Sequence, residues 1–346
     1  MMTLQRGMMY CLGHVLPLFL LCLLPVAGFA QPVNNIKIAT LAPIGSPWHE
    51  VLEDIAQDFR IISNNTVRLT IYAGGVAGDE SDMIRKMRLN QLQAVAVSAE
   101  GMSYIDKGSY GLSIPLLARN YEELDWIRSQ IEPELISRFQ ANGVEVLSWA
   151  DIGWVYWFTR RPAPDPEDLR NQRIFNWAGD SYLPRLWRSA GFQSVSLAAT
   201  DIMPAFQTGM IDAIASSPLT VASFQWFSSA RYMTDMPWAA MTGAILIRQD
   251  TWESVPTELR ARLQAAVDTR ALRIKNEIRY SDDDAIAAMR EYGLTVVPVS
   301  DENRAKWYAI VDQYGRELRG TLIDAEIYDQ LMEIKARMNQ TGFGAP

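Results

Sequence analysis

The chain has 346 residues, 49% of them hydrophobic, so it can bury a large core and is long enough for two lobes. Its 40 acidic residues outnumber its 32 basic ones, and an acidic chain without a basic stripe is a poor candidate for binding nucleic acid or anionic lipid. We therefore expect a globular protein that does not bind nucleic acid.

Residues 1–30 have the pattern of a secretory signal peptide. Arg6 lies near the start, the apolar run VLPLFLLCLLPVAGFA follows, and the small residues Gly28 and Ala30 stand before Gln31. The apolar run is short for a membrane span, which needs about 20 residues. We expect cleavage before Gln31 and a free periplasmic protein.

Both cysteines, Cys11 and Cys22, and one of the two histidines, His14, fall in that segment, which leaves His49 alone. The mature chain should therefore have no cysteine nucleophile, no disulfide framework and no thiolate metal site. With one histidine, a serine-histidine or histidine-metal site is also disfavoured. The loop GGVAGDE lacks the lysine and hydroxyl residue of a phosphate loop, and SDDDA lacks the glycine and glutamate of a calcium loop. We expect no enzyme, no cofactor and no metal.

The first half of the chain alternates strands and helices. Val67, Leu69 and Ile71 alternate with polar residues and predict a half-buried strand. The other predicted elements are a short buried strand at 94–98 and helices at 47–60, 79–90 and 121–141, the last begun by Asn120 and ended by Gly143. This alternation implies an α/β sheet with its ligand edge at the carboxyl ends of the strands.

A second lobe is predicted to begin near Phe158, where RRPAPDPED gives a proline-rich connection. From Pro256 to Tyr292 apolar residues recur every three or four positions, and Gly293 follows, which predicts one long helix. About 37 residues at roughly 1.5 Å each would reach about 55 Å, longer than one lobe is wide. A dimer-forming coiled coil is the alternative for this helix.

Four segments in order resemble one known family. They are IKIATLAPIGSPWHEVLEDIAQDF, VRLTIYAGGVAGDESDMIRKMRLNQLQAVAVSAEG, LRNQRIFNWAGDSYLPRLW and AFQTGMIDA. Together they resemble the DctP-type solute-binding proteins of TRAP transporters. The resemblance implies a two-lobe periplasmic binding protein fold (type II-like, α/β), with the long interlobe helix as a hinge brace. The expected boundaries are 31–157 plus 246–283 for lobe I and 158–245 plus 284–346 for lobe II.

The chain departs from that family where it usually binds a carboxylate. The family's two frequent arginines align with Phe175 and Val155, its bulky aromatic residue with Ala199, and an asparagine with Ser216. An arginine fork orients a carboxylate by charge-assisted hydrogen bonds, which phenylalanine cannot make. The resemblance therefore implies an atypical branch whose ligand differs from the usual anions.

Tryptophans are frequent around these positions: Trp48, Trp154, Trp157, Trp177, Trp226 and Trp238. About half of them are expected in the core rather than at a ligand. Trp48 and Trp177 are the firmest candidates for the pocket, and Trp226 is the least secure. A pocket lined by several of these tryptophans would suit a bulky apolar or aromatic ligand.

Polar candidates accompany them. Glu100 follows the strand at 94–98, where family members carry an acidic or hydroxyl ligand contact, while Asp79 fits a helix N-cap better than a ligand contact. Asn176 and Ser217 are weaker additions. A relocated anchor remains open at three arginines, which are Arg160, Arg161 and Arg185.

These observations favour a periplasmic receptor that closes over a small, largely apolar molecule and presents it to TRAP permease subunits in the membrane. A carboxylate receptor with a relocated arginine is one alternative. A sensor subunit for a signalling receptor is another. An enzyme with Asp79 and Glu100 as an acid-base pair is disfavoured by the lack of cysteine and near lack of histidine.

Overall fold

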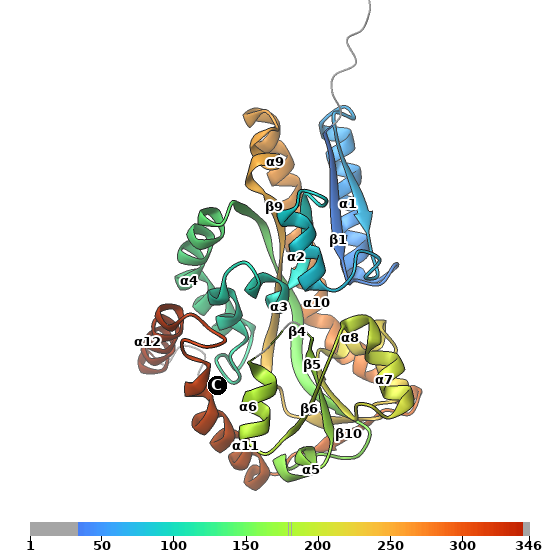
Figure 1. The fold of residues 1–346 in the computed structure, drawn as a ribbon, viewed down its shortest axis with the longest axis vertical. Coiled ribbons are helices and arrows are strands. Elements are labelled where there is room, and N and C mark those ends of the chain that lie inside the picture. Colours follow the sequence, from blue (N-terminus) through green and yellow to red (C-terminus); the bar gives the residue numbers. More distant parts are fainter. Residues whose placement is uncertain (1–33, 179, 181, 342–346) are drawn as a thin grey trace, which may run out of the picture. The chain divides into compact units, whose positions relative to one another are not determined.

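Strands and helices alternate through the computed structural model, which describes residues 34–178, 180 and 182–341 (Figure 1). These residues belong to one compact unit that spans 33–346. The predicted signal peptide lies outside the described residues. Within the described part of the chain, none of the helices is long and apolar enough to cross a membrane.

The first half of the chain contains the elements predicted for lobe I. They are β1 (Asn34–Thr40), α1 (Pro47–Ile62), β2 (Val67–Tyr72), α2 (Glu80–Arg88), β3 (Ala94–Ser98), α3 (Ala99–Ser103), the 3-10 helix η1 (Lys107–Ser113) and α4 (Tyr121–Ala141). Both predicted strands are confirmed, and α4 begins after Asn120, whose side chain accepts a hydrogen bond from Glu123 N at 2.9 Å. Local patterns were sufficient here because caps and alternation act within a few residues.

The remainder of the chain supplies the second lobe and the connections between the lobes. The next elements are β4 (Val144–Thr159), α5 (Pro166–Arg170), β5 (Arg173–Trp177), α6 (Leu183–Ser189), β6 (Gln193–Leu197), η2 (Ala199–Asp201), α7 (Ile202–Thr208), β7 (Ala213–Ser216), α8 (Pro218–Ser223), η3 (Trp226–Ser228), β8 (Tyr232–Asp235), β9 (Ala239–Arg248) and α9 (Gln249–Glu253). The last are α10 (Thr257–Glu291), β10 (Thr295–Pro298), α11 (Asp301–Tyr314), η4 (Gly315–Leu318) and α12 (Ala325–Thr341).

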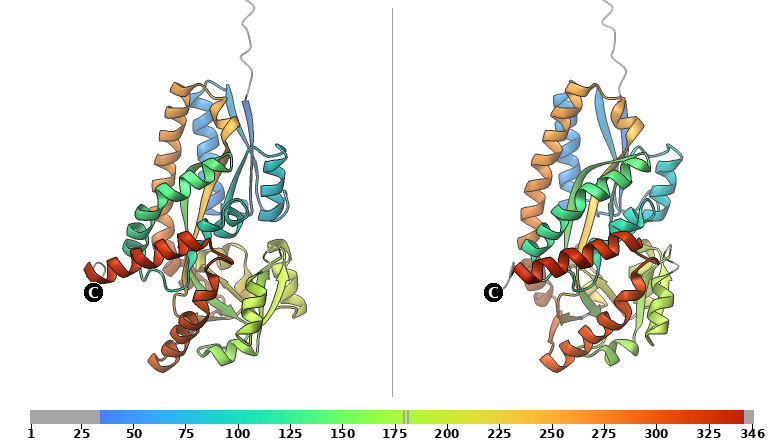
Figure 2. Two further views of the ribbon diagram at one scale, coloured as in Figure 1. Left: turned by 60° about the vertical axis from the view of Figure 1, so that its left-hand side comes forward. Right: turned by 90° about the vertical axis from the view of Figure 1, so that its left-hand side faces the viewer.

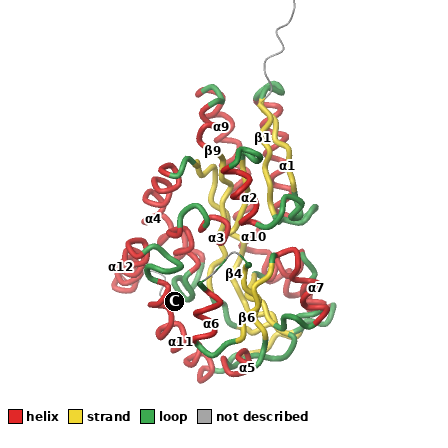
Figure 3. Tube along the Cα trace, viewed as in Figure 1, coloured by secondary structure: helices red, strands yellow, loops and turns green. Residues whose placement is uncertain are grey.

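One long strand connects the two halves of the sheet. The strand order is β2-β1-β3-β9-β4-β7-β5-β6, with β8 beside β4 and β10 beside β8. Residues 144–155 of β4 pair with β9 in the first lobe, whereas residues 156–159 pair with β7 in the second. Because β4 pairs with strands of both lobes, the strands of the two lobes form one connected sheet through the middle of the molecule (Figure 3).

Helix α10 is shared by both hydrophobic cores. Its residues Leu263 and Val267 pack with Ile36, Leu52 and others in the first lobe, whereas its Met289 packs in the core of the second lobe. The predicted long helix is thereby confirmed. Because a single 35-residue helix packs on both lobes, it can brace them on one side while the opposite side opens or closes.

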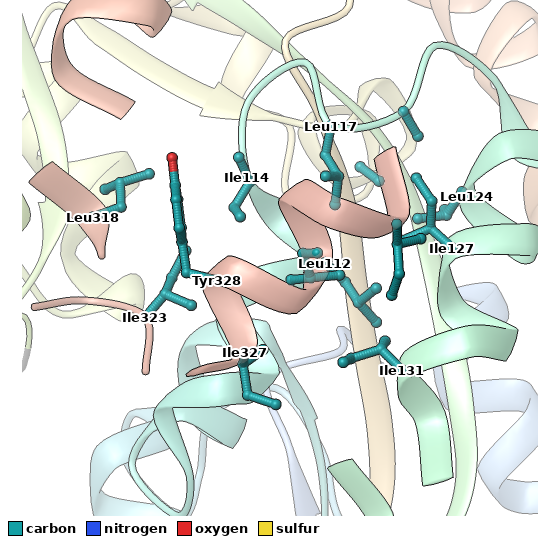
Figure 4. Packing of buried hydrophobic residues seen from close by; sticks show 14 of the residues in the cluster. Leu112, Ile114, Leu117, Leu124, Ile127, Ile131, Leu318, Ile323, Ile327 and Tyr328 are labelled. Carbon is teal, nitrogen blue, oxygen red and sulfur yellow. The ribbon is translucent and has the colours of Figure 1, made fainter. Parts of the chain in front are cut away.

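The last helix packs against the first lobe. Ile327 and Tyr328 of α12 share a buried cluster with Leu112 of η1 and with Leu124 and Ile131 of α4, seen close by in Figure 4. In Figure 2, α12 crosses beside α4. The predicted assignment of all of 284–346 to lobe II therefore does not fit this helix, because its apolar face is buried on α4 after a chain reversal that no local pattern announces.

Candidate functional site

A cavity of about 340 Å³ lies where the carboxyl ends of strands from both lobes converge. Thr40 ends β1 and Ser98 ends β3 in the first lobe, whereas Trp177 ends β5 and Ser216 ends β7 in the second, and all four line the cavity. Ligands of α/β sheets bind at this edge, and the volume is in the range of small-molecule sites, about 300–1,000 Å³.

Aromatic side chains form much of the wall. Phe175 and Trp177 lie side by side on β5, with ring centroids 5.3 Å apart at 72°, an edge-to-face contact. Trp48 reaches the cavity from the start of α1. Aromatic faces of this kind bury apolar ligand surface effectively.

A second aromatic group lies around Trp157, which is only 2% exposed. Its ring centroid is 5.7 Å from that of Trp187 and 6.0 Å from that of Trp238, and all three tryptophans line the cavity. Trp307 of α11 stacks behind Trp157 at 6.3 Å and fixes it from the side of the core. This part of the wall is therefore rigid as well as apolar.

No cationic side chain lines the cavity among the described residues. The three arginines considered as a relocated anchor lie elsewhere. Arg160 donates to the Phe206 carbonyl, Arg161 Nη2 donates to the Asn171 carbonyl at 2.6 Å, and the Arg185 guanidinium lies 5.7 Å from the Tyr182 ring. The described wall thus offers no guanidinium to a carboxylate.

Two buried glutamates stand at the first-lobe side of the cavity. Glu80 accepts hydrogen bonds from Ser98 N at 2.7 Å, from the Ser98 hydroxyl at 2.7 Å and from Gly101 N at 2.8 Å. Burial raises the pKa of Glu80 to about 7 in spite of these donors. A Cβ at Gly101 would lie 2.8 Å from Glu80 Oε2, so this arrangement requires glycine there.

Glu100 is different because half of its carboxyl group is unpaired. Its Oε1 accepts a hydrogen bond from the Tyr104 hydroxyl at 2.7 Å, while Oε2 is buried without a hydrogen-bond partner in the part of the chain that the structure describes. Burial, with a smaller contribution from the nearby Asp180, raises the pKa of Glu100 to about 8. At neutral pH this carboxyl group is therefore largely protonated and can donate a hydrogen bond.

Most of the site residues expected from the sequence line this cavity. They are Trp48, Glu100, Val155, Trp157, Phe175, Asn176, Trp177, Ala199, Ser216 and Trp238, together with the less secure Trp226. Whether they contact a ligand remains a prediction.

Three expected residues do not line the cavity. Asp79 caps α2 by accepting from Glu80 N at 2.9 Å, and Ser217 caps α8 by accepting from Thr220 N at 3.3 Å. Trp154 packs on the Tyr121 ring at 5.4 Å. An irregularity between Asp151 and Gly153 shifts the register of β4, and such a bulge changes which residues face the cavity.

Several lining residues were not expected from the sequence. Trp149 and Thr242 face the cavity from β4 and β9, whose pairing had no sequence signature, and Glu80 follows the expected N-cap Asp79. Trp187 also lines the cavity, from α6. It lies ten residues after Trp177, and no pattern in the sequence indicates that this helix turns Trp187 toward the cavity. Among the described residues, no group of three or more histidine, cysteine, aspartate or glutamate side chains could hold a metal ion.

Comparison with known sequences matches residues 38–320 to the family model described as bacterial extracellular solute-binding protein, family 7 (DctP). A solute-binding protein of Albidiferax ferrireducens is 24% identical over 301 residues, which cover 82% of this chain and 86% of that protein. The sialic acid-binding periplasmic protein SiaP of Vibrio cholerae is 18% identical over 285 residues, 79% of this chain and 85% of that protein.

Solved structures show the same fold. The sugar acid binding protein of Advenella mimigardefordensis in complex with galactonate has a TM-score of 0.82 at 14% identity, covering 88% of this chain and 99% of that one. A TRAP periplasmic solute binding protein of Shewanella oneidensis with bound succinate has a TM-score of 0.80 at 14% identity, with coverage of 88% and 99%. The chain has the two-lobe fold of these receptors, and it belongs to the DctP family of TRAP solute-binding proteins, which are binding proteins rather than enzymes.

Proposed function

We propose that this protein is the periplasmic receptor of a TRAP-type transporter for a small, largely apolar or aromatic molecule. The ligand would bind between Trp48 on the first lobe and Phe175, Trp177 and Trp157 on the second. Closure of the lobes around it would present the loaded form to TRAP permease subunits in the membrane. A signal peptide at residues 1–30 would direct the chain to the periplasm.

The observation that carries this proposal is the composition of the cavity wall. Its described residues include many aromatic and aliphatic side chains, two buried glutamates and the ion-paired Asp151, but no arginine, lysine or histidine. An anion entering this cavity would lose hydration without a fixed cation to compensate, which costs several kcal/mol. An apolar molecule gains about 25 cal/mol for each Å² of surface that it buries.

Neighbouring structures sharpen the contrast. The proteins with bound galactonate and succinate hold carboxylates. In this chain Phe175 and Val155 occupy the positions at which the resemblance expects arginine, and both line the cavity. A carboxylate receptor with a relocated arginine finds no support in the positions of Arg160 and Arg161, which donate to backbone carbonyls elsewhere.

A thermal-shift screen with two sets of compounds tests the proposal. One set contains succinate, malate, galactonate and sialic acid, and the other contains uncharged aromatic and alicyclic molecules. The second set should raise the melting temperature and the first should not. Strong stabilisation by the anions, with none by the apolar set, would contradict the proposal.

A substitution at the key position extends this test. Phe175→Arg introduces the missing guanidinium beside Trp177, so it should weaken apolar ligands by about tenfold or more and favour carboxylates. Trp252→Phe, a change in a buried aromatic residue that packs on Phe59 outside the cavity, is the matched control and should alter neither class.

Localisation has its own test. Mass spectrometry of the protein from a periplasmic extract should find a mature amino terminus near Gln31. A chain that retains residues 1–30 and stays with the membrane fraction would contradict this part of the proposal.

A further inference from the structure

The cavity wall carries a set of hydrogen-bond donors without partners. They are Trp48 Nε1, Trp149 Nε1, Trp157 Nε1, Asn176 Nδ2 and Thr242 Oγ1, each buried with no partner within the described part of the protein. Asn176 is 4% exposed and Thr242 is fully buried. Buried donors left unpaired are unfavourable, so wall groups of this kind gain most from a ligand that brings acceptors.

The donors come from both lobes. Trp48, Trp149 and Thr242 belong to α1, the first part of β4, and β9, which are first-lobe elements. Asn176 on β5 and Trp157 on the last part of β4 belong to the second lobe. A ligand with more than one acceptor would therefore be held from both sides, which favours the closed form over the open one.

The charges around the cavity decide what kind of acceptor fits. Among the described residues, three acidic ones line it: Asp151, which is paired with Arg128 and Arg279, and the glutamates Glu80 and Glu100. The carboxyl groups of Asp79 and Asp180 also lie near enough to Glu100 to affect its ionisation. A ligand carboxylate would add another negative charge to this group. Acceptor oxygens that carry no net charge avoid that repulsion.

A cationic ligand fits the unpaired groups less well. An ammonium group donates hydrogen bonds and accepts none, yet the unpaired atoms just described are mostly donors. The acceptor it would find there is Glu100 Oε2, and ionising Glu100 inside the wall is itself unfavourable because its surroundings are apolar and acidic.

Burial, and after it the acidic neighbours, raise the pKa of Glu100 and favour its neutral form. The neighbours of Glu100 are Glu80 at the start of α2, its N-cap Asp79, Asp180 after β5, Tyr104 directly after α3 and Tyr110 on η1, and they are carboxyl or phenol groups rather than cations. The raised pKa is about 8. A protonated Glu100 adds one more O–H donor to the set.

We propose that the ligand of this receptor is an uncharged molecule with an apolar body and two or more acceptor oxygens, such as a carbonyl, amide or ether, bound by the unpaired donors of the cavity wall and by the buried carboxyl group of Glu100. This inference rests on the proposed function, because it specifies the polar part of the same apolar ligand.

Calorimetric titration with matched probes tests the inference at pH 7. The first series is 3-phenylpropanamide, 3-phenylpropanoate and 3-phenylpropylammonium, which share one body and differ in the charge of one end, and a naphthyl series enlarges the body. The amide should bind at least about tenfold more tightly than either charged partner, because it alone accepts hydrogen bonds without bringing a charge.

Variants test the donors themselves. Thr242→Val removes one buried hydroxyl at almost constant volume and should weaken the amide by about fivefold. It should leave propylbenzene, which has the same body but no acceptor, unchanged. Trp252→Phe removes an indole N–H outside the cavity and should change neither. An equal loss for the amide and propylbenzene would mean that Thr242 only shapes the cavity, and would overturn its role as a donor.

The remaining outcomes separate this inference from the proposed function. Tighter binding of the carboxylate or of the ammonium compound in both series would overturn the inference while leaving an apolar-bodied ligand in place. If no member of either series binds, the proposal of an apolar ligand fails, and this inference fails with it.

Discussion

Two buried carboxyl groups at the same cavity have opposite surroundings. Asp151 on β4 and Glu100 on α3 are 3% and 4% exposed. Asp151 accepts a hydrogen bond from Arg128 of α4 and another, at 2.7 Å, from Arg279 of α10. Among the described residues, the carboxyl group of Glu100 accepts a hydrogen bond only from the hydroxyl of Tyr104.

The buried arginines pair with carboxylates between the helices and β4 rather than with Glu100 at the cavity. Arg279 also donates two hydrogen bonds to Asp125, at 2.6 and 2.8 Å, and its guanidinium lies 4.3 Å from the Tyr121 ring. Burial opposes ionisation of Asp125, but the donors Arg279 and Lys275 outweigh it and lower its pKa to about 2. Guanidinium groups thus join α10 to α4 and β4, while the described wall of the cavity has none.

The largest expected loss of stability follows from breaking the buried ion pair of Asp151. Arg128→Met leaves the buried Asp151 with one cation instead of two and should lower the free energy of unfolding by about 3 kcal/mol. Urea denaturation measures this directly. Arg319→Met breaks an exposed pair with Asp329 and should change the stability little, so equal losses in the two variants would contradict the comparison.

The unpaired Glu100 should make the free energy of unfolding depend on pH. Because the folded protein holds the Glu100 proton up to about pH 8 while the unfolded chain releases it near 4.5, the free energy of unfolding should fall as pH rises through this interval. Glu100→Gln cannot ionise, so its stability should fall less, by a margin on the order of 3 kcal/mol between pH 4.5 and 8.5.

Thermal unfolding at a series of pH values provides that measurement. Glu333→Gln, which changes an exposed carboxylate on α12, is the control and should follow the wild-type profile. Glu80 remains in both proteins, so some loss of stability toward high pH should persist in Glu100→Gln. Superimposable profiles of the wild type and Glu100→Gln would show that Glu100 is already ionised at neutral pH.

A smaller effect is expected at Gly153, where β4 passes between the two lobes. Its φ is +125°, and an added Cβ would lie 2.8 Å from the Cβ of Ser217. Gly153→Ala should therefore cost about 1–3 kcal/mol in the free energy of unfolding. At Gly315 the nearest atom to an added Cβ is 3.8 Å away, so Gly315→Ala should change stability little, and similar losses in both would argue against close packing at Gly153.

Closure of the lobes is expected to change the size of the protein slightly. α10 and β4 keep the two lobes joined on one side, so a ligand bound by both should draw them together. X-ray scattering should then show a smaller radius of gyration at a saturating concentration of a bound apolar ligand. An unchanged value from an open starting state would count against hinge closure.

The sequence predicted the elements that depend on local patterns. The strands at 67–72 and 94–98, helix α4 with its Asn120 cap, and the long helix α10 are confirmed. Phe175 and Trp177 were expected near the ligand, and the structure places both in the cavity wall. The strands and helices follow from periodicity and capping, which act over a few residues, whereas Phe175 and Trp177 were expected from the family resemblance, and their contact with a ligand stays a prediction.

What escaped prediction depends on contacts between distant residues. Thr242 and Trp149 reach the cavity because β9 pairs with β4 across nearly a hundred residues of sequence, and α12 returns to α4 from the end of the chain. Trp154 was expected in the site as one of six tryptophans around the positions where the chain departs from the family, but it lies next to the irregularity between Asp151 and Gly153 and packs on Tyr121. A strand bulge leaves no certain mark in one sequence.

Native mass spectrometry of the receptor isolated from the periplasm of its own host is the most direct test of the central claim that the ligand is uncharged and largely apolar. The intact complex gives the mass of the small molecule, and its release under denaturing conditions allows its identification. We expect an uncharged molecule with an apolar or aromatic body and acceptor oxygens, lost from Phe175→Arg but retained in Trp252→Phe. A C4-dicarboxylate, sialic acid or sugar acid in the wild-type protein would contradict the account.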